Sequence, residues 1–173
     1  MKRKADRRSP VSVLCSALGT ALLIILILTC IPFTIPKCLG YQIYTVVSGS
    51  MEPAIPTGSL VYVKAVEPEK VEVNDVIAFY GGRDTNAIIT HRVVENRIGE
   101  EQFVTKGDAN RTEDMNPVSY WNFIGRVVVS VPALGVGAQS LTGYEGKIAA
   151  GCLIGLAVVL HLLASFFDKV NLK

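Results

Sequence analysis

The sequence predicts a mainly β fold, in which a small β domain is held between two transmembrane helices. Two uncharged runs, residues 11–31 and 148–167, are each long enough to cross a bilayer. Between them, short runs rich in Val, Ile and Tyr are bounded by Gly, Pro, Asn and Asp, a pattern typical of strands and turns. Half of the 173 residues are hydrophobic and only 18% are charged, which argues against disorder and against a wholly soluble globule.

The first uncharged run predicts a retained membrane anchor over residues 11–33. Its 21 residues would extend roughly 31 Å as a helix, about the thickness of the hydrocarbon core. A basic stretch precedes the run, so a cleavable signal peptide is the alternative. The hydrophobic regions of signal peptides span only about 7–15 residues, and no small-x-small cleavage site follows before Pro32 and Pro36. A retained helix is therefore the better interpretation.

The second uncharged run predicts a transmembrane helix over residues 148–167. His161 is its only ionisable residue, and a histidine inside a span can be functional. It lies toward one end of the run, and the sequence offers it no evident partner in the first span. We therefore expect a neutral histidine near the membrane interface.

The distribution of charge predicts how the two spans are oriented. Residues 1–10 and the tail, residues 168–173, are basic, whereas residues 34–147 carry 10 basic and 13 acidic side chains, a net charge of −3. By the positive-inside rule both termini are cytoplasmic and the middle segment is extracytoplasmic. We therefore expect a multi-pass integral membrane protein with an extracytoplasmic domain.

The segment between the spans is expected to form one β-rich domain, residues 41–133, followed by a linker, residues 134–147. No stretch there has apolar residues at helical spacing over 11 or more positions. A small barrel or folded sheet is expected, without a readable strand order. The expected strands cover residues 42–47, 59–66, 76–80, 88–95, 102–106 and 124–131.

Composition narrows the chemistry that this domain can perform. The net charge of +2 is too small to indicate nucleic-acid binding. No CxxC motif and no Gly-rich phosphate loop occurs, and His91 is the only histidine between the spans, so neither a metal nor a nucleotide cofactor is expected. Acyl transfer remains, which needs a nucleophile, a base and a group that orients the base.

Four residues between the spans are candidates for acyl transfer. Ser50 follows a β-rich run that ends at a Ser-Gly-Ser turn before Pro53. His91, in the sequence Ile-Ile-Thr-His-Arg-Val-Val, is the candidate base. Asp108 and Asp114, six residues apart, are the acidic candidates. Each of these residues taken alone is more simply a loop, strand or turn residue, and spacing brings none of them into contact.

In combination, the three blocks SGSMEP, ITHRVVE and TKGDAN, with a second aspartate downstream and an anchor upstream, resemble the type I signal peptidases. The resemblance is to the signalase or SipW-like branch of the endoplasmic reticulum, archaea and some Gram-positive bacteria. It covers roughly residues 41–132. His91 decides the branch, because the common bacterial enzymes have a lysine as the base at that position. Lys64 and Lys106 remain alternative bases, although neither matches the family's base position.

The resemblance implies a signal-peptidase-like β domain and a catalytic role for each candidate. Ser50 would be the nucleophile and His91 the general base. The backbone N–H of Ser50, aided by the Ser48 hydroxyl, would stabilise the oxyanion. Either Asp108 or Asp114 would orient His91, and the sequence does not choose between them.

The resemblance also implies how a substrate binds and with what the protein associates. A signal peptide with small residues at −1 and −3 would add as a strand beside Tyr44, Val46 and Val47, with Ile89 near the base. The partners would be secretory preproteins, the lipid bilayer and export machinery or complex subunits, with no nucleic acid. Because many prokaryotic members have a second span and typical reticulum subunits lack it, the resemblance implies a location in the plasma membrane, or in the endoplasmic reticulum membrane if the source is eukaryotic. A non-catalytic membrane-anchored β domain that binds extracytoplasmic peptides is the alternative, and a self-cleaving regulator of related fold is a third hypothesis.

Overall fold

The computed structural model of the chain describes residues 9–82 and 87–171. The chain divides into two compact units, one made of Met1–Pro32 with Leu141–Lys173 and the other of Phe33–Ser140. Most of the predicted basic N-terminus, residues 1–8, and the last two residues of the predicted tail lie outside the described residues. Each unit is considered by itself.

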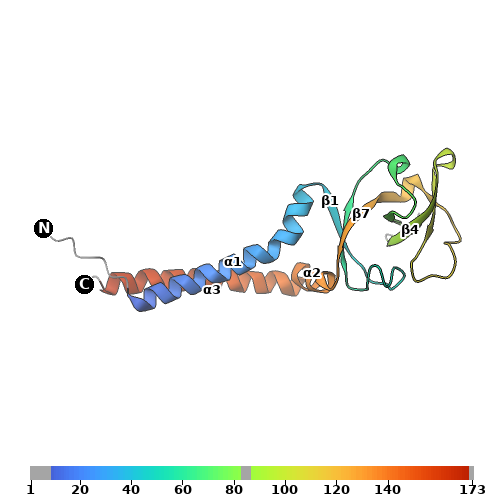
Figure 1. Ribbon diagram of the computed structural model, residues 1–173. Helices are drawn as coiled ribbons and strands as arrows, with labels where there is room; N and C mark the ends of the chain where they lie inside the picture. The colour runs from blue at the N-terminus through green and yellow to red at the C-terminus, as the bar shows by residue number, and fades with distance from the viewer. Residues whose placement is uncertain (1–8, 83–86, 172–173) are drawn as a thin grey trace. The chain divides into compact units, whose positions relative to one another are not determined.

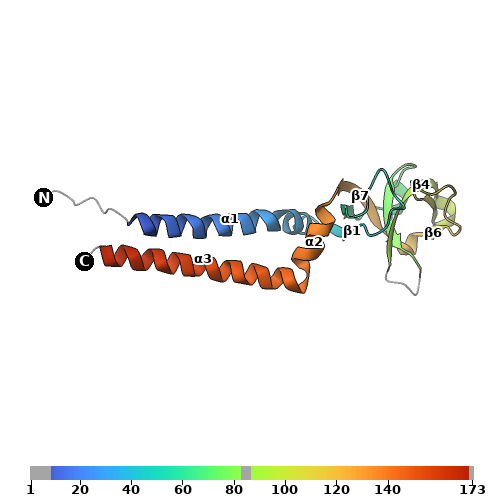
Figure 2. The same cartoon turned by 90° about the horizontal axis from the view of Figure 1, so that it is seen from below.

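The first unit consists mainly of two long helices, α1 (Pro10–Cys38), whose residues up to Pro32 belong to it, and α3 (Tyr144–Asn171). Within this unit the two helices lie antiparallel and side by side (Figures 1 and 2). Both are long and apolar enough to cross a membrane, with mean hydropathies of 2.7 and 2.3, and only 11% of each apolar window is buried. They extend beyond the expected spans at both ends. Low burial distinguishes these helices from the core helices of a soluble protein, so membrane association follows from their composition and exposure.

Small residues form the contact between these two helices. The buried residues there are Ser12 and Gly19 on α1 and Ala157 and Ala164 on α3. A Cβ on Gly19 would lie 2.4 Å from His161 Nδ1, so the histidine ring occupies the space that this glycine leaves open. Close approach at small residues is the usual way in which helices associate in lipid.

His161 differs in one respect from expectation, since it does have a partner in the first span. Its Nε2 lies 3.4 Å from Thr20 Oγ1, and its Nδ1 lies 2.8 Å from the carbonyl oxygen of Ala157. A carbonyl only accepts, so Nδ1 carries the hydrogen and Nε2 accepts from the threonine. The sequence missed this contact because the pairing of two helices depends on their rotation and register, which composition does not give.

The second unit is built on one curled antiparallel sheet (Figure 1). Its seven strands lie in the order β1-β2-β7-β3-β4-β5-β6. This architecture confirms the expected fold class. The strands are β1 (Tyr41–Thr45), β2 (Leu60–Lys64), β3 (Val76–Tyr80), β4 (Ile88–Arg97), β5 (Gln102–Lys106), β6 (Val118–Ser119) and β7 (Phe123–Val131).

Register shifts and one glycine accommodate the curvature of the sheet. Pairing shifts by a residue between Tyr62 and Val63 on β2 and between Val93 and Glu95 on β4. Such bulges bend a strand and increase its twist. On β7, a Cβ at Gly125 would lie 2.4 Å from the carbonyl oxygen of Lys64, so only glycine permits that approach of two strands.

The core of the sheet unit consists of two clusters of apolar side chains. One is centred on the fully buried Phe103, whose ring centroid lies 4.8 Å from that of Tyr120 and 5.3 Å from that of Phe123. The second cluster contains Met51, Ile55, Val61, Val63 and Ala78. Met51 and Ile55 come from the segment between β1 and β2, so this segment is anchored in the core rather than free in solvent.

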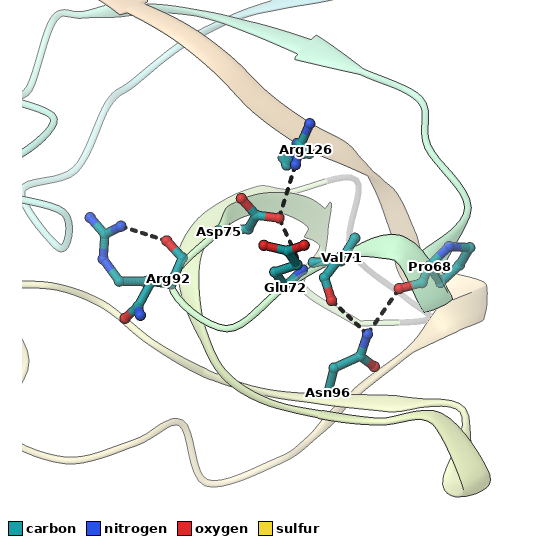
Figure 3. A network of polar contacts seen from close by, with 8 residues as sticks. Pro68, Val71, Glu72, Asp75, Arg92, Asn96 and Arg126 are labelled. Atoms are coloured by element: carbon teal, nitrogen blue, oxygen red, sulfur yellow. Dashed lines mark hydrogen bonds and ion pairs between the residues drawn. The ribbon is translucent and has the colours of Figure 1, made fainter.

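Polar contacts fasten the segment between β2 and β3 to the sheet (Figure 3). The Asn96 amide donates to the carbonyl oxygens of Pro68 and Val71, at 3.0 and 2.9 Å. Asp75 accepts from the backbone N–H of Glu72 and from Arg126. These hydrogen bonds pair backbone N–H and C=O groups that have no partner in the β-sheet, and they fix the irregular segment in one conformation.

A short helix, α2 (Leu134–Thr142), lies in the segment that the sequence assigns to a linker, between β7 and α3 along the chain (Figure 2). The sequence shows no sign of this helix, because its nine residues are fewer than the 11 positions over which helical spacing was sought. Gly135 and Gly137 give the segment a poor intrinsic helix propensity. Packing of Gly135 and Ala138, both buried, compensates for that low propensity.

Candidate active site

Ser50 lies in a turn in the segment between β1 and β2, and hydrogen bonds hold this turn in place. The Glu52 N–H donates to the carbonyl oxygen of Gly49 at 3.0 Å, and the Glu52 carboxylate accepts from the Thr57 N–H and hydroxyl at 3.2 and 2.9 Å. Met51, only 1% exposed, is inserted in the core directly after Ser50. The buried methionine and the capped turn hold the half-buried Ser50 at the surface of the sheet unit.

His91 is held by Asp114 from the far end of the 107–114 loop. His91 Nδ1 donates to Asp114 Oδ2 at 2.6 Å, and the same oxygen accepts from the buried Thr105 hydroxyl, also at 2.6 Å. The Asp114 N–H donates to the carbonyl oxygen of Thr105 at 2.8 Å, which fixes the carboxylate's backbone. Because the carboxylate accepts from Nδ1, the Nε2 atom of His91 is left as a hydrogen-bond acceptor.

Gly107 brings the serine turn and the histidine ring together. A Cβ at this buried glycine would lie 2.6 Å from the carbonyl oxygen of Ser50 and 3.0 Å from His91 Nε2. The carbonyl oxygen of Ser50 and His91 Nε2 thus lie within 3.0 Å of the same point, so the serine main chain and the histidine ring are close neighbours. The Ala109 N–H also donates to the carbonyl oxygen of Ser50 at 2.9 Å, so the loop that carries Asp114 is bonded to the serine residue itself.

Asp108 has a different partner from Asp114. Arg92 Nε and Nη2 donate to the two carboxylate oxygens of Asp108, at 2.8 and 2.6 Å. Arg92 Nη1 donates to the carbonyl oxygen of Asn74 at 2.8 Å, and the hydrogen bond from Arg92 to Asp108 raises the pKa of the guanidinium. Of the two acidic candidates, Asp114 contacts His91, whereas Asp108 ties the 107–114 loop to β4 and to the segment before β3.

A cavity of about 280 Å³ opens beside Ser50. Its walls come from the end of β1, the serine turn and the start of β4, and burial raises the pKa of the Tyr44 phenol in one wall, so this group stays protonated. All four residues expected to bind substrate and both oxyanion candidates belong to the lining. The lining residues are Tyr44, Thr45, Val46, Val47, Ser48, Ser50, Met51, Val61, Ile88, Ile89 and Thr90.

Two stretches of strand beside the cavity have an unpaired edge within the described part of the chain. β1 pairs only with β2 and lies at one end of the sheet. β4 pairs with β3 from Ile88 but with β5 only from Arg92 onward, so residues 88–91 lack a strand on one side. Unpaired N–H and C=O groups of this kind are a template for an added extended peptide.

The two alternative bases lie away from this arrangement. Lys64 is the exposed last residue of β2, and Lys106 lines a separate depression with Arg92 and Asp108. Neither lysine lines the cavity beside Ser50. The sequence had included Thr105, Gly107 and Arg92 only as members of the blocks TKGDAN and ITHRVVE and had given none of them a role. The local signal was the position of these residues inside the same two blocks as His91 and Asp108.

The arrangement contains the parts that acyl transfer requires. The main chain of Ser50 lies close to the His91 imidazole, whose other nitrogen is oriented by a carboxylate. A hydroxyl, an imidazole and a carboxylate are the residue types that supply a nucleophile, a base and an orienting group. Ser48 Oγ lies 3.5 Å from Ser50 Oγ and so is close enough to act on an oxygen of a bound carbonyl. The adjoining cavity and strand edges can hold an extended peptide.

No family model matches the chain, but individual proteins do. It is 42% identical over 87 residues to Signal peptidase I W of Bacillus subtilis (strain 168), a match that covers 49% of this chain and 45% of that protein. It is 31% identical over 125 residues to the human Putative signal peptidase complex catalytic subunit SEC11B, covering 66% of this chain and 75% of that protein. It is 30% identical over 130 residues to Signal peptidase complex catalytic subunit SEC11C of Rattus norvegicus, with coverages of 68% and 67%.

Proposed function

Because the chain belongs to the type I signal peptidases of the SipW and endoplasmic-reticulum type, we propose that it is a membrane-bound serine endopeptidase that removes signal peptides from exported preproteins. The observation that carries the proposal is the contact set around Gly107, which links Ser50, His91 and the loop of Asp114. The relatives' names supply the substrate class, and the two apolar helices supply the membrane anchor.

In this mechanism the two nitrogens of His91 have separate tasks. Ser50 Oγ attacks the scissile carbonyl carbon, and His91 Nε2 takes the hydroxyl proton. Asp114 holds Nδ1–H and stabilises the imidazolium that forms. The tetrahedral oxyanion accepts hydrogen bonds from the Ser50 N–H and the Ser48 hydroxyl, and loss of one such donor typically costs about 3–4 kcal/mol of barrier.

The proton then returns to the product. The imidazolium protonates the leaving amine, so the mature protein departs with a free N-terminus and the signal peptide remains as an ester on Ser50. His91 next removes a proton from water, which attacks the ester. Collapse of the second tetrahedral intermediate releases the signal peptide as a carboxylate and regenerates the Ser50 hydroxyl.

We assign substrate binding to the two unpaired strand edges. The C-terminal region of the signal peptide would lie extended between β1 and residues 88–91 of β4, with main-chain hydrogen bonds on both sides. Alternate side chains of a strand point the same way, so residues −1 and −3 would both face the cavity beside Ser50. Its modest volume and the buried Met51 and Val61 in its lining favour small side chains at both positions.

The topology that fits this function places the sheet unit outside the cytoplasm. The basic ends of the chain favour two spans with both termini cytoplasmic. A signal peptide's hydrophobic region stays in the bilayer, so an anchored enzyme meets the cleavage site at a raised effective concentration. The relatives named as catalytic subunits of a complex support a further proposal, that other membrane subunits assemble with this chain where the source has them.

The test uses the full chain, purified in detergent and mixed with one model preprotein that has alanine at −1 and −3. We expect a single product whose new N-terminus follows the −1 residue. Ser50→Ala should abolish this product, whereas Ser130→Ala, on β7 and outside the cavity, should cleave like the wild type. Equal cleavage by Ser50→Ala would refute the serine mechanism. Tight binding of the peptide without cleavage would instead favour a non-catalytic peptide-binding domain.

The assignment of the two aspartates is tested in the same assay. Asp114→Asn would put an amide donor opposite His91 Nδ1 and favour the wrong tautomer, a change that costs up to about 10⁴-fold in rate in comparable sites. Asp108→Asn should cost less, because Asp108 bonds Arg92 rather than the base. A larger loss from Asp108→Asn than from Asp114→Asn would reverse the assignment.

A further inference from the structure

Gly135, the second residue of α2, packs against the main chain just before β2 and against the side chain of Thr45 at the end of β1. Its N–H donates to the carbonyl oxygen of Gly58 at 2.9 Å, and the Thr45 hydroxyl donates to its carbonyl oxygen at 3.4 Å. A Cβ on Gly135 would lie 2.6 Å from the carbonyl oxygen of Ser59 and 2.7 Å from that of Gly58. Only a glycine can approach two carbonyl groups so closely.

The groups that Gly135 contacts are the ones that hold the residue after β1 in place. The Val46 N–H donates to the carbonyl oxygen of Ser59 at 2.9 Å, and the Gly58 N–H donates to the carbonyl oxygen of Val46 at 2.8 Å. These bonds continue the pairing of β1 with β2 beyond its last ladder pair, Thr45 with Leu60. A displacement of Ser59 or Gly58 therefore moves Val46.

Val46 and Thr45 lie in the wall of the cavity beside Ser50, whereas Gly135 does not line it. The serine itself is held from elsewhere, by the hydrogen bond from the Ala109 N–H to its carbonyl oxygen and by the buried Met51. The contacts of Gly135 thus bear on the wall that would receive the substrate strand and not on the Ser50, His91 and Asp114 group.

We propose that Gly135 is a positioning residue for substrate binding, because its contact with Gly58 and Ser59 fixes the end of β1 that forms the cavity wall. The inference rests on the proposed peptidase function. It also gives α2 a role, since the segment that leads to the second apolar helix braces the substrate-binding edge. A disturbed wall weakens binding of the extended peptide, so the effect falls on KM, while the reacting groups, and hence kcat, are little changed.

The test compares Gly135→Ala with Gly137→Ala in the full chain in detergent, using a peptide that spans a preprotein cleavage site. Gly137 lies on the same helix, and a Cβ there would meet nothing within 4 Å. Neither glycine has a positive φ, and alanine raises the helix propensity at both positions, so the two variants differ in packing. We expect Gly135→Ala to raise KM about tenfold with kcat within about threefold, and Gly137→Ala to leave both unchanged.

Hydrogen exchange provides a readout that does not depend on activity. A peptide fragment that contains Val46 should exchange its amide hydrogens faster in Gly135→Ala than in the wild type or in Gly137→Ala. Unchanged KM and unchanged exchange in a folded Gly135→Ala protein would overturn the proposal. A fall in kcat with KM unaltered would also overturn it, because the wall would then act on the chemical step.

A second variant serves if Gly135→Ala does not fold. Thr45→Val keeps the volume of the side chain but removes the hydroxyl that donates to the carbonyl oxygen of Gly135. Because Thr45 itself lines the cavity, hydrogen exchange is the readout for this variant. Faster exchange at Val46 supports the proposal, and unchanged exchange overturns it. Failure of the proposed function is recognised separately, because the wild-type chain would then cleave no peptide while the exchange result would still stand.

Discussion

The sheet unit and the helix pair are packed by opposite rules. In the sheet unit the most buried side chains are large, such as Phe103, Met51 and Leu60. In the helix pair the buried residues are all small, whereas the large side chains of α1 and α3 are mostly exposed. These buried residues are Ser12, Gly19, Gly146, Ala157 and Ala164. The sheet unit buries its large apolar side chains, whereas the helix pair leaves them exposed on its surface. An exposed apolar surface is stable in lipid, where two helices associate through close contact of small residues.

At Gly107 the sheet unit, like the helix pair, uses a small residue to allow a close contact. Here too a missing side chain lets two groups approach, in this case the carbonyl of Ser50 and the ring of His91. The comparison teaches that large side chains supply the stability of this unit, whereas glycines set the close approaches that the site needs. Each of the following substitutions tests one side of that difference.

The largest effect is expected from Gly107→Ala. Its Cβ would meet the carbonyl oxygen of Ser50 at 2.6 Å and Asn110 Nδ2 at 2.8 Å, so the serine turn and the histidine must move apart. A shift of about 1 Å in a catalytic group can cost on the order of 10²-fold in rate, and we expect at least that loss in kcat/KM. Gly99→Ala, where a Cβ meets nothing within 4 Å, is the control. Wild-type cleavage by Gly107→Ala would contradict the close packing of the site.

The second prediction compares how much stability is lost when a large apolar side chain is truncated to alanine in each of the two units. Phe103→Ala removes a fully buried ring from the core and should lower the free energy of unfolding of the sheet unit by about 3–5 kcal/mol. Leu162→Ala truncates an outward-facing side chain of α3 and should change stability by less than about 0.5 kcal/mol in detergent. Denaturant titration of each purified variant measures both. Equal losses would mean that the two units do not differ in packing.

The smallest effect is expected from overpacking the helix pair with Gly19→Leu. A Cβ there collides with the His161 ring, and overpacking typically costs about 1–3 kcal/mol. Gly151→Leu, on α3 with open space around it, is the control. The measurement is the rate of disulfide formation between cysteines introduced at Ser12 and Ala164, after the four native cysteines are replaced by serine. A slower rate only in Gly19→Leu is expected, and an unchanged rate would count against the glycine contact.

The sequence predicts those parts of the fold whose pattern is local. The strands Val76–Tyr80 and Gln102–Lys106 have the expected bounds, because runs of β-branched and aromatic residues end at clear turn signals. β6 has only two residues, too few to carry a period of its own. α2 was not expected because its two glycines disfavour a helix, and contacts with Gly58 and Thr45 on distant parts of the chain stabilise its start.

The residues of the candidate site also fall into those that a local motif predicts and those that depend on the fold. Ser50 and His91 were selected from motifs that the sequence displays directly. The partner of His91 depends on the path of the 107–114 loop, and spacing does not reveal that Asp114 returns to the histidine while Asp108 turns toward Arg92. Gly107 appears in the sequence only as a member of the block TKGDAN. Its closeness to both Ser50 and His91 arises from the meeting of two segments that are about 40–60 residues away from each other along the chain.

The central claim is that Ser50 and His91 act as one catalytic unit, and a double-mutant comparison tests it most directly. The value of kcat is measured for Ser50→Ala, His91→Ala and the double variant on one preprotein in detergent. If the two residues act together, each single substitution costs nearly as much as both, since either one removes the whole proton-transfer step. Losses that multiply in the double variant, or appreciable cleavage by Ser50→Ala, would contradict the account.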